Sequence, residues 1–211
     1  MRKLILVLFI IVLGFVANAQ PAGYSPVPDL AKFKEQFTVI AKKTETIKSD
    51  FTQEKNLSML SEKIISKGKF WFKKENLLRM EYSKPFEYLM ILNKDNMYIK
   101  DGQKESKVAV KSNKIFQQIN KITVDCVQGT VFNNPDFVTK AYESKGSYLI
   151  EMSPVGKTLK EFFKSIDVII DKKDYSVTTI EMNENSGDNT IIRFTNRELN
   201  TPIPDALFAI K

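Results

Sequence analysis

The sequence contains no histidine and only one cysteine, Cys126, among its 211 residues. Without histidine, the Ser-His and Cys-His nucleophile pairs, histidine general bases and imidazole metal ligands are excluded. A single cysteine cannot form an internal disulfide framework, and its apolar helical surroundings predict a buried thiol instead of a nucleophile. Glycine is scarce too, and neither a phosphate-binding glycine loop, a Cys-x-x-Cys pair nor an EF-hand spacing occurs. The sequence therefore predicts no metal, no cofactor and no catalytic residues.

Paired carboxylates are the catalytic groups that remain, in the arrangement used by glycoside hydrolases. The pairs Glu181/Glu184 and Asp167/Asp171 flank predicted hairpin turns, where solvated charge is ordinary. An exported glycosidase is one hypothesis, and it requires two acids that face one cleft.

The N-terminus is typical of a secretory signal peptide. Arg2 and Lys3 precede an apolar run over residues 4–16, and Ala17-Asn18-Ala19 forms a small-x-small cleavage site. The apolar run is shorter than a typical transmembrane helix, so we expect residues 1–19 to be removed on export. Residues 20–28 are rich in proline and lack periodicity, which predicts a flexible linker. Residues 29–211 are expected to form a single domain.

The charge of the chain is mildly basic. The full sequence carries 32 Lys+Arg against 25 Asp+Glu, and removal of Arg2 and Lys3 leaves 30 against 25, a net charge of +5. The lysines are scattered along the chain, which predicts a solvated surface and no nucleic-acid partner.

The middle of the chain reads as a meander of antiparallel strands. Phe70 and Phe72 share one face of the first strand, and the same alternation continues at Leu78, Met80 and Tyr82. A meander of this kind curves, and its concave face must be filled by side chains and a covering helix, or by a ligand. Further strands are predicted over residues 49–55, 88–92, 137–142, 148–152, 162–170, 175–182 and 190–194.

Two segments have helical spacing instead. The first starts at Asp29, a predicted N-cap, and its apolar residues recur as far as Ile47. The second runs from Asn113 to Cys126 and interrupts the strands, so we expect it to lie across the sheet. The predicted fold class is mainly β with α. About ten strands are close to the upper limit for an open twisted sheet, so we expect the sheet to curl.

In this order, the segments resemble the periplasmic outer-membrane lipoprotein carrier family, the LolA-like proteins. The resemblance spans nearly all of the chain after the signal peptide. The matching pieces are Phe51-Thr52-Gln53, residues 68–74, residues 76–82 with Pro85, Leu89-Met90-Ile91 with the turn at Asp95-Asn96, and residues 200–208.

The resemblance implies an unclosed antiparallel β barrel of about eleven strands covered by a helical lid. It also implies a monomeric chaperone in the periplasm of a Gram-negative bacterium, whose hydrophobic cavity holds the acyl chains of lipoproteins. The implied partners are acylated lipoproteins, an inner-membrane ABC-type lipoprotein-releasing complex as donor, and an outer-membrane acceptor. A lipid-sensing regulatory domain of the same fold is the alternative.

The resemblance and the apolar faces together nominate a set of cavity residues. We expect the acyl chains to contact Phe33, Phe37 and Ile40 on the first helix, Phe70, Phe72, Leu78, Met80, Tyr82, Leu89 and Ile91 on strands, and Ile115, Phe116 and Ile119 on the lid. The arginine that holds the lid in this family aligns with Lys74, which makes Lys74 the candidate lid latch. Lysine cannot form the planar fork of arginine, so the latch is weaker or is built elsewhere.

Overall fold

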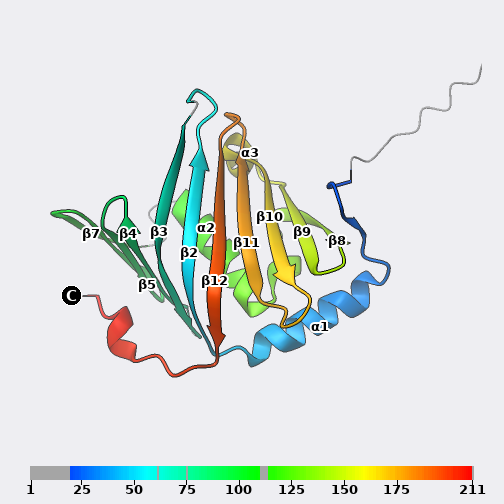
Figure 1. The fold of residues 1–211 in the computed structure, drawn as a ribbon, viewed down its shortest axis with the longest axis horizontal. Helices are drawn as coiled ribbons and strands as arrows, with labels where there is room; N and C mark the ends of the chain where they lie inside the picture. Colours follow the sequence, from blue (N-terminus) through cyan, green and yellow to red (C-terminus); the bar gives the residue numbers. More distant parts are fainter. Residues whose placement is uncertain (1–19, 61, 75, 110–113, 211) are drawn as a thin grey trace, which may run out of the picture.

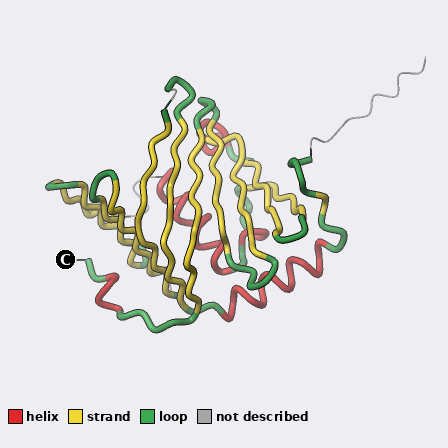
Figure 2. Tube along the Cα trace, in the orientation of Figure 1, coloured by secondary structure: helices red, strands yellow, loops and turns green. Residues whose placement is uncertain are grey.

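The computed structural model describes residues 20–60, 62–74, 76–109 and 114–210, with the backbone alone at 108 and 114–120. A single twelve-stranded antiparallel sheet dominates it, in the order β1-β8-β9-β10-β11-β12-β2-β3-β4-β5-β6-β7 (Figures 1 and 2). The edge strands β1 (Ser25–Pro26) and β7 (Lys104–Ala109) do not pair with each other. The barrel is therefore unclosed, which confirms the predicted fold class, with twelve strands instead of about eleven.

The remaining strands form two meanders joined by the pairing of β12 with β2. Their bounds are β2 Thr46–Asn56, β3 Lys63–Lys73, β4 Leu77–Lys84, β5 Tyr88–Asn93, β6 Asn96–Asp101, β8 Phe137–Glu143, β9 Ser147–Pro154, β10 Phe163–Asp171, β11 Val177–Glu184 and β12 Asn189–Leu199. Local turn chemistry fixes several registers. Gly102, for example, has a φ of +57° in the tight turn that pairs Asp101 with Lys104.

In the described part of the chain, three α-helices and two 3₁₀ turns accompany the sheet. Their bounds are α1 Leu30–Lys43, α2 Lys114–Gln128, α3 Lys157–Phe162, η2 Val131–Asn133 and η3 Asp205–Phe208. The predicted N-cap is confirmed, because the Asp29 carboxylate accepts a hydrogen bond of 2.9 Å from the Lys32 N–H. Among the described residues, no helix combines the length and apolarity that a bilayer span requires.

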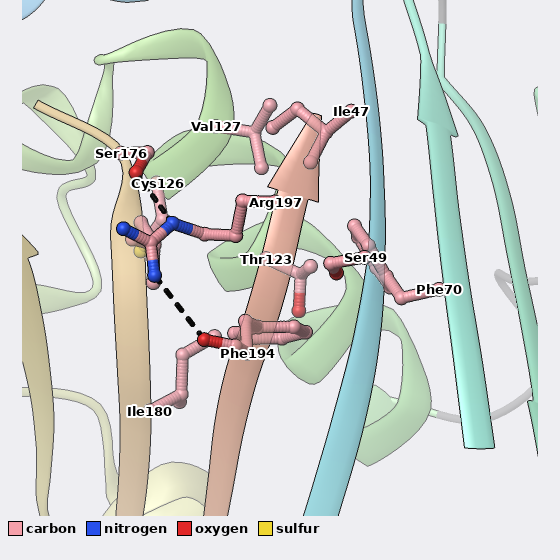
Figure 3. Close-up of a pocket in the computed structure, with 11 residues that line it drawn as sticks. Ile47, Ser49, Phe70, Thr123, Cys126, Val127, Ser176, Ile180, Phe194 and Arg197 are labelled. Atoms are coloured by element: carbon pink, nitrogen blue, oxygen red, sulfur yellow. Dashed lines mark hydrogen bonds between the residues drawn. The ribbon is translucent and has the colours of Figure 1, made fainter. Parts of the chain in front are cut away.

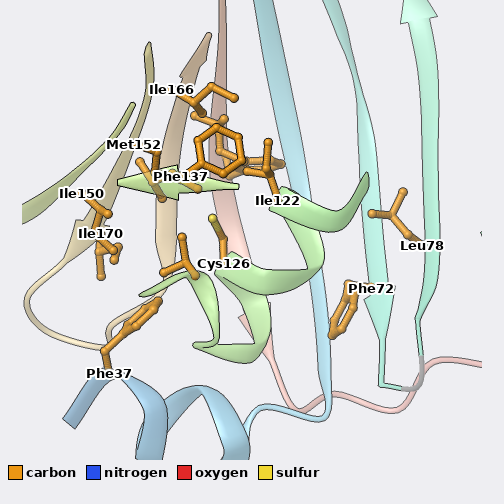
Figure 4. Close-up of a cluster of buried hydrophobic side chains, with 14 of the residues drawn as sticks. Phe37, Phe72, Leu78, Ile122, Cys126, Phe137, Ile150, Met152, Ile166 and Ile170 are labelled. Carbon is orange, nitrogen blue, oxygen red and sulfur yellow. The ribbon is translucent and has the colours of Figure 1, made fainter. Parts of the chain in front are cut away.

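The helix α2 lies against the concave face of the sheet, and α1 runs across one end of the strands (Figure 1). Inward side chains of the strands pack there against α1 and α2 in one main core cluster (Figure 4). Phe72, Ile150 and Ile166 are completely buried in it. The period-2 alternation of the strands explains this, because every second residue points to the concave face.

A second cluster lies on the outer face of β3 to β6, beneath the C-terminal segment. It joins Ile91 and Tyr98 to Ile203 and Phe208. Hydrogen bonds hold the segment, from Arg79 Nη1 to the Leu207 carbonyl at 3.1 Å and from Asn93 Nδ2 to the Phe208 carbonyl at 3.0 Å. This half of the sheet therefore has apolar contacts on both faces.

Three local predictions are wrong. Residues 20–28 contain the edge strand β1, in which Ser25 pairs with Glu143, instead of only a flexible linker. Ile47 belongs to β2 and not to the first helix, because the backbone becomes extended at Thr44. Phe162 ends the short helix α3, which the sequence pattern did not separate from the strand that follows. The predicted signal peptide, residues 1–19, lies outside the described residues.

Candidate functional site

The space between α2 and the concave face is the candidate site. Six of the nominated side chains meet there in the main core cluster, namely Phe33, Phe37, Phe70, Phe72, Leu78 and Met80. Phe33 and Phe37 come from one face of α1, four residues apart, and the others alternate along β3 and β4. Helical and strand periodicity therefore bring these six residues together, and their contact with an acyl chain remains a prediction.

Tyr82 packs against this cluster without being fully buried, whereas Ile40 is not one of its members. Tyr82 is half-buried and packs its ring on Phe51, with the ring centroids 4.8 Å apart. Its hydroxyl donates to Gln53 Oε1 at 2.9 Å, and burial, with the neighbouring Tyr88, raises the pKa of Tyr82 to about 12. Ile40 is half-buried on α1, outside the main cluster.

The assignment of Leu89 and Ile91 to the cavity is wrong. Both belong to the cluster on the outer face, under the C-terminal segment. In the β4–β5 pairing, the residues opposite Leu78 and Met80 are Leu92 and Met90, so these two side chains face inward. Since alternate residues of a strand point to opposite faces, Leu89 and Ile91 must point outward.

The inner face of α2 supplies Ile122 and Cys126, both buried against the sheet (Figure 4). These residues continue the predicted apolar stripe at a spacing of one helical turn. The side chains of Ile115, Phe116 and Ile119, which were nominated for the lid, lie outside the described residues.

A small cavity of about 20 Å³ remains between α2 and strands β2, β3, β11 and β12 (Figure 3). It is lined by Ile47, Ser49, Phe70, Thr123, Cys126, Val127, Ser176, Val177, Ile180, Phe194 and Arg197. A cavity of this size holds one water molecule and no acyl chain. Within the described part of the chain, this cavity is therefore too small for an acyl chain, and a larger ligand could enter it only if α2 moved away from the sheet.

Arg197 is a polar residue at this cavity that the sequence pattern did not predict. Its Nε donates to Ser176 Oγ at 2.8 Å, its Nη1 to the Phe194 carbonyl at 3.2 Å, and its Nη2 to Asp171 Oδ2 at 3.3 Å. Asp174 lies 3.8 Å from the same Nη2. The guanidinium is therefore neutralised within the protein.

A β-bulge explains why Arg197 points inward. The β12–β2 register shifts between Thr195 and Glu198, and Asn196 adopts a φ of +51°. Without the extra residue, strict alternation from Phe194 would place Arg197 on the outer face. Strand alternation alone could not have found this residue.

Cys126 has no activated thiol. It is free and buried, as predicted, and burial together with the nearby Asp125 carboxylate raises the pKa of the thiol far above its ordinary range. A neutral buried thiol is a poor nucleophile, so Cys126 acts here as an apolar core residue.

The C-terminal end of α2 is fixed to its surroundings. The buried Asp125 carboxylate accepts hydrogen bonds from Thr130 Oγ1 at 3.0 Å and from Asn134 Nδ2 at 2.8 Å. The Gly129 carbonyl accepts a bond of 3.0 Å from Thr38 Oγ1 of α1. Gly129 has a φ of +71°, and a Cβ there would lie 2.7 Å from the Cβ of Ala41. Glycine is therefore required for both the backbone conformation and the close approach of α1.

The nominated latch, Lys74, contacts α1 and the segment after it. Its Nζ donates to the Lys42 carbonyl and lies 2.5 Å from the Glu45 carboxylate. The contact from the same turn to α2 is made instead by Asn76, whose Oδ1 accepts a bond of 3.2 Å from Gln128 Nε2. A latch role for Lys74 remains a prediction.

The two acids of the candidate pair Asp167/Asp171 do not face one cleft. Asp167 and Glu181 are cross-strand neighbours on the outer face, next to Glu151. Burial, with repulsion from Glu151 and Glu181, raises the pKa of Asp167 to about 6. Asp171 instead pairs with Arg197. Over the described ranges, no cluster of three or more His, Cys, Asp or Glu side chains is arranged to hold a metal ion.

Comparison with known proteins identifies relatives of this fold. The family model described as "Outer membrane lipoprotein carrier protein LolA" matches residues 42–211. No curated protein sequence matches the chain.

Several solved structures resemble it at low sequence identity. An uncharacterized conserved protein from Thermus thermophilus is 8% identical, with 82% of this chain and 91% of that chain covered and a TM-score of 0.50. A LolA superfamily protein from Nitrosomonas europaea is 7% identical, with coverages of 84% and 97% and a TM-score of 0.46. The MucA/MucB complex of Pseudomonas aeruginosa is 12% identical, with coverages of 84% and 60% and a TM-score of 0.48. At these identities the likeness is one of fold.

Proposed function

Because this chain belongs to the LolA family of outer membrane lipoprotein carrier proteins, we propose that it carries lipoproteins across the periplasm from the inner to the outer membrane. The acyl chains would lie between α2 and the concave face of the sheet. The observation that supports this proposal best is the continuous apolar inner wall, which runs over both meanders and is covered by a separate amphipathic helix. Such an arrangement lets a ligand replace the helix as the cover.

The energetics fit this task. Burying hydrocarbon is worth about 0.8 kcal/mol per methylene, so shielding one chain of about fourteen methylenes is worth on the order of 10 kcal/mol. Part of this free energy offsets the contacts that Ile122 and Cys126 of α2 lose when the helix leaves the sheet. The rest of this free energy favours the buried acyl chain over one exposed to water.

The proposed action is binding and not chemistry. The chain has no histidine, its one thiol is buried and neutral, and the acids of Asp167 and Glu181 lie on the face opposite the cavity. An ABC-type inner-membrane complex would load the carrier and an outer-membrane acceptor would unload it. Transfer requires that α2 be displaced reversibly, and apolar contacts suit this because they have no directional geometry to restore.

Co-purification tests the proposal. The mature chain, residues 20–211, is isolated from the periplasm of cells that express the donor complex and one acylated lipoprotein, and bound material is identified by mass spectrometry. We expect the acylated lipoprotein in the complex. A lipoprotein whose acylated cysteine is replaced by serine is the matched control, and it should not bind.

Recovery of the carrier free of acylated protein, with the donor present, would count against the proposal.

Deletion of the gene for this protein separates the two functional hypotheses. A carrier predicts mislocalised lipoproteins, whereas a lipid-sensing regulatory domain predicts altered envelope stress signalling with normal lipoprotein sorting.

A further inference from the structure

The hydroxyl group of Ser49 is buried without a partner at the cavity. Ser49 lies on β2 and is 3% exposed. In the part of the chain that the structure describes, four buried side-chain polar atoms lack a hydrogen-bond partner, and Ser49 Oγ is the one that borders this cavity. Buried hydroxyls in native proteins are nearly always hydrogen-bonded. An unpaired donor facing a space therefore points to a group that occupies the space.

The surroundings of Ser49 indicate what kind of group fits. Apolar side chains, including Ile47, Phe70 and Phe194, form most of the lining (Figure 3). Such walls suit hydrocarbon that carries a polar atom where it meets the Ser49 hydroxyl.

The charge at the cavity argues against an anionic ligand. The guanidinium of Arg197 is the cation there, and Asp171 and Asp174 lie 3.3 and 3.8 Å from its Nη2. A carboxylate or phosphate entering the cavity would meet these two acids as well as the arginine. A neutral acceptor meets no such repulsion.

We propose that Ser49 donates a hydrogen bond to a neutral carbonyl oxygen, an ester or amide, at the head of a bound acyl chain. This inference rests on the proposed function, because the acyl chain can reach Ser49 only after α2 has moved. Ser49 thereby selects esterified or amide-linked acyl chains over free fatty acids and over plain hydrocarbon. While α2 covers the sheet, the same hydroxyl faces a space that holds one water.

Displacement of a neutral fluorescent dye from the mature chain tests this selection. Hexadecane, methyl palmitate and palmitate share their chain length and differ at the head. We expect methyl palmitate to bind about two- to tenfold more tightly than hexadecane, the range for one hydrogen bond. Palmitate is expected to bind more weakly than the ester.

Variants then assign the preference to the hydroxyl. Ser49→Ala should bind the ester and hexadecane equally, and Ser49→Thr should retain the preference. Ser153→Ala, on the outer face of β9, is the matched control and should behave like wild type. Thermal unfolding establishes that each variant folds, so a loss of preference in a folded Ser49→Ala protein supports the inference.

Three outcomes overturn the inference and leave the proposed function standing. The first is a Ser49→Ala protein that keeps the ester preference. The second is wild-type protein that binds palmitate more tightly than the ester. The third is wild-type protein that binds all three ligands equally, in which case Ser49 only holds a water. If none of the ligands displaces the dye, the proposed function fails as well, which distinguishes the two failures.

Discussion

Replacement of Gly129 by alanine tests whether the C-terminal end of α2 is fixed by close packing on α1. The added Cβ would lie 2.7 Å from the Cβ of Ala41 and 2.9 Å from the Cα of Thr38. The second atom is backbone and cannot rotate away. In addition, the φ of +71° is unfavourable for alanine.

Gly102 offers a matched control, because the substitution Gly102→Ala isolates the part of the destabilisation that comes from the backbone conformation. Its φ is +57°, yet a Cβ there would meet no atom within 4 Å. Both substitutions incur the left-handed backbone cost of about 1–2 kcal/mol. Only Gly129→Ala adds overpacking, typically about 1–3 kcal/mol. We therefore expect Gly129→Ala to lower the free energy of unfolding by about 1–3 kcal/mol more than Gly102→Ala does.

Urea denaturation followed by circular dichroism measures both values. A partial rescue is expected from the double variant with Ala41→Gly, because one of the two close contacts is then removed while that to Thr38 remains. Equal destabilisation by Gly129→Ala and Gly102→Ala would refute the reasoning, since it would mean that α1 and α2 do not pack closely at this point.

Two further predictions concern the faces of the sheet. Leu92→Ala and Ile91→Ala should both destabilise the fold by about 2–5 kcal/mol, since both side chains are buried, but only Leu92→Ala should weaken binding of a neutral dye, because Leu92 faces inward. Equal effects on dye binding would contradict the face assignment. Burial raises the pKa of the Asp167 carboxyl from 3.8 to about 6 in the folded protein, so its ionised form destabilises the fold. The contribution of Asp167 to the free energy of unfolding is therefore fully present below the pKa of the unfolded state and is lost as the pH rises through the pKa of the folded state. Asp167→Asn should therefore gain about 1 kcal/mol over wild type at ~pH 7.5, allowing for partial exposure, and less at ~pH 4. Urea denaturation at both pH values measures this gain, and a gain that does not depend on pH would contradict the assignment.

Features set by neighbouring residues could be predicted from the sequence. The Asp29 cap, the hairpin at Gly102 and the inward faces of β3 and β4 follow from turn chemistry and from clear apolar-polar alternation. The run over residues 88–92 is apolar on both faces, so its inward side is set only by the register with Leu78 and Met80.

Other features depend on contacts between distant parts of the chain. Strand β1 pairs with β8 more than a hundred positions later, so its proline-rich sequence indicated only a linker. The bulge that turns Arg197 inward depends on the pairing of β12 with β2. The burial of the unpartnered Ser49 hydroxyl results from the packing of α2 on four strands, which the local sequence does not reveal.

The C-terminal segment bears on the stability of the sheet when α2 moves away from it. It packs against Ile91 and Tyr98 on the outer face of β3 to β6, and those contacts share no residue with the main core cluster. Withdrawal of α2 would thus leave this half of the sheet with one apolar face still covered. This half of the sheet can therefore stay folded whether or not its concave face is covered, because the contacts on its outer face do not depend on those of the concave face.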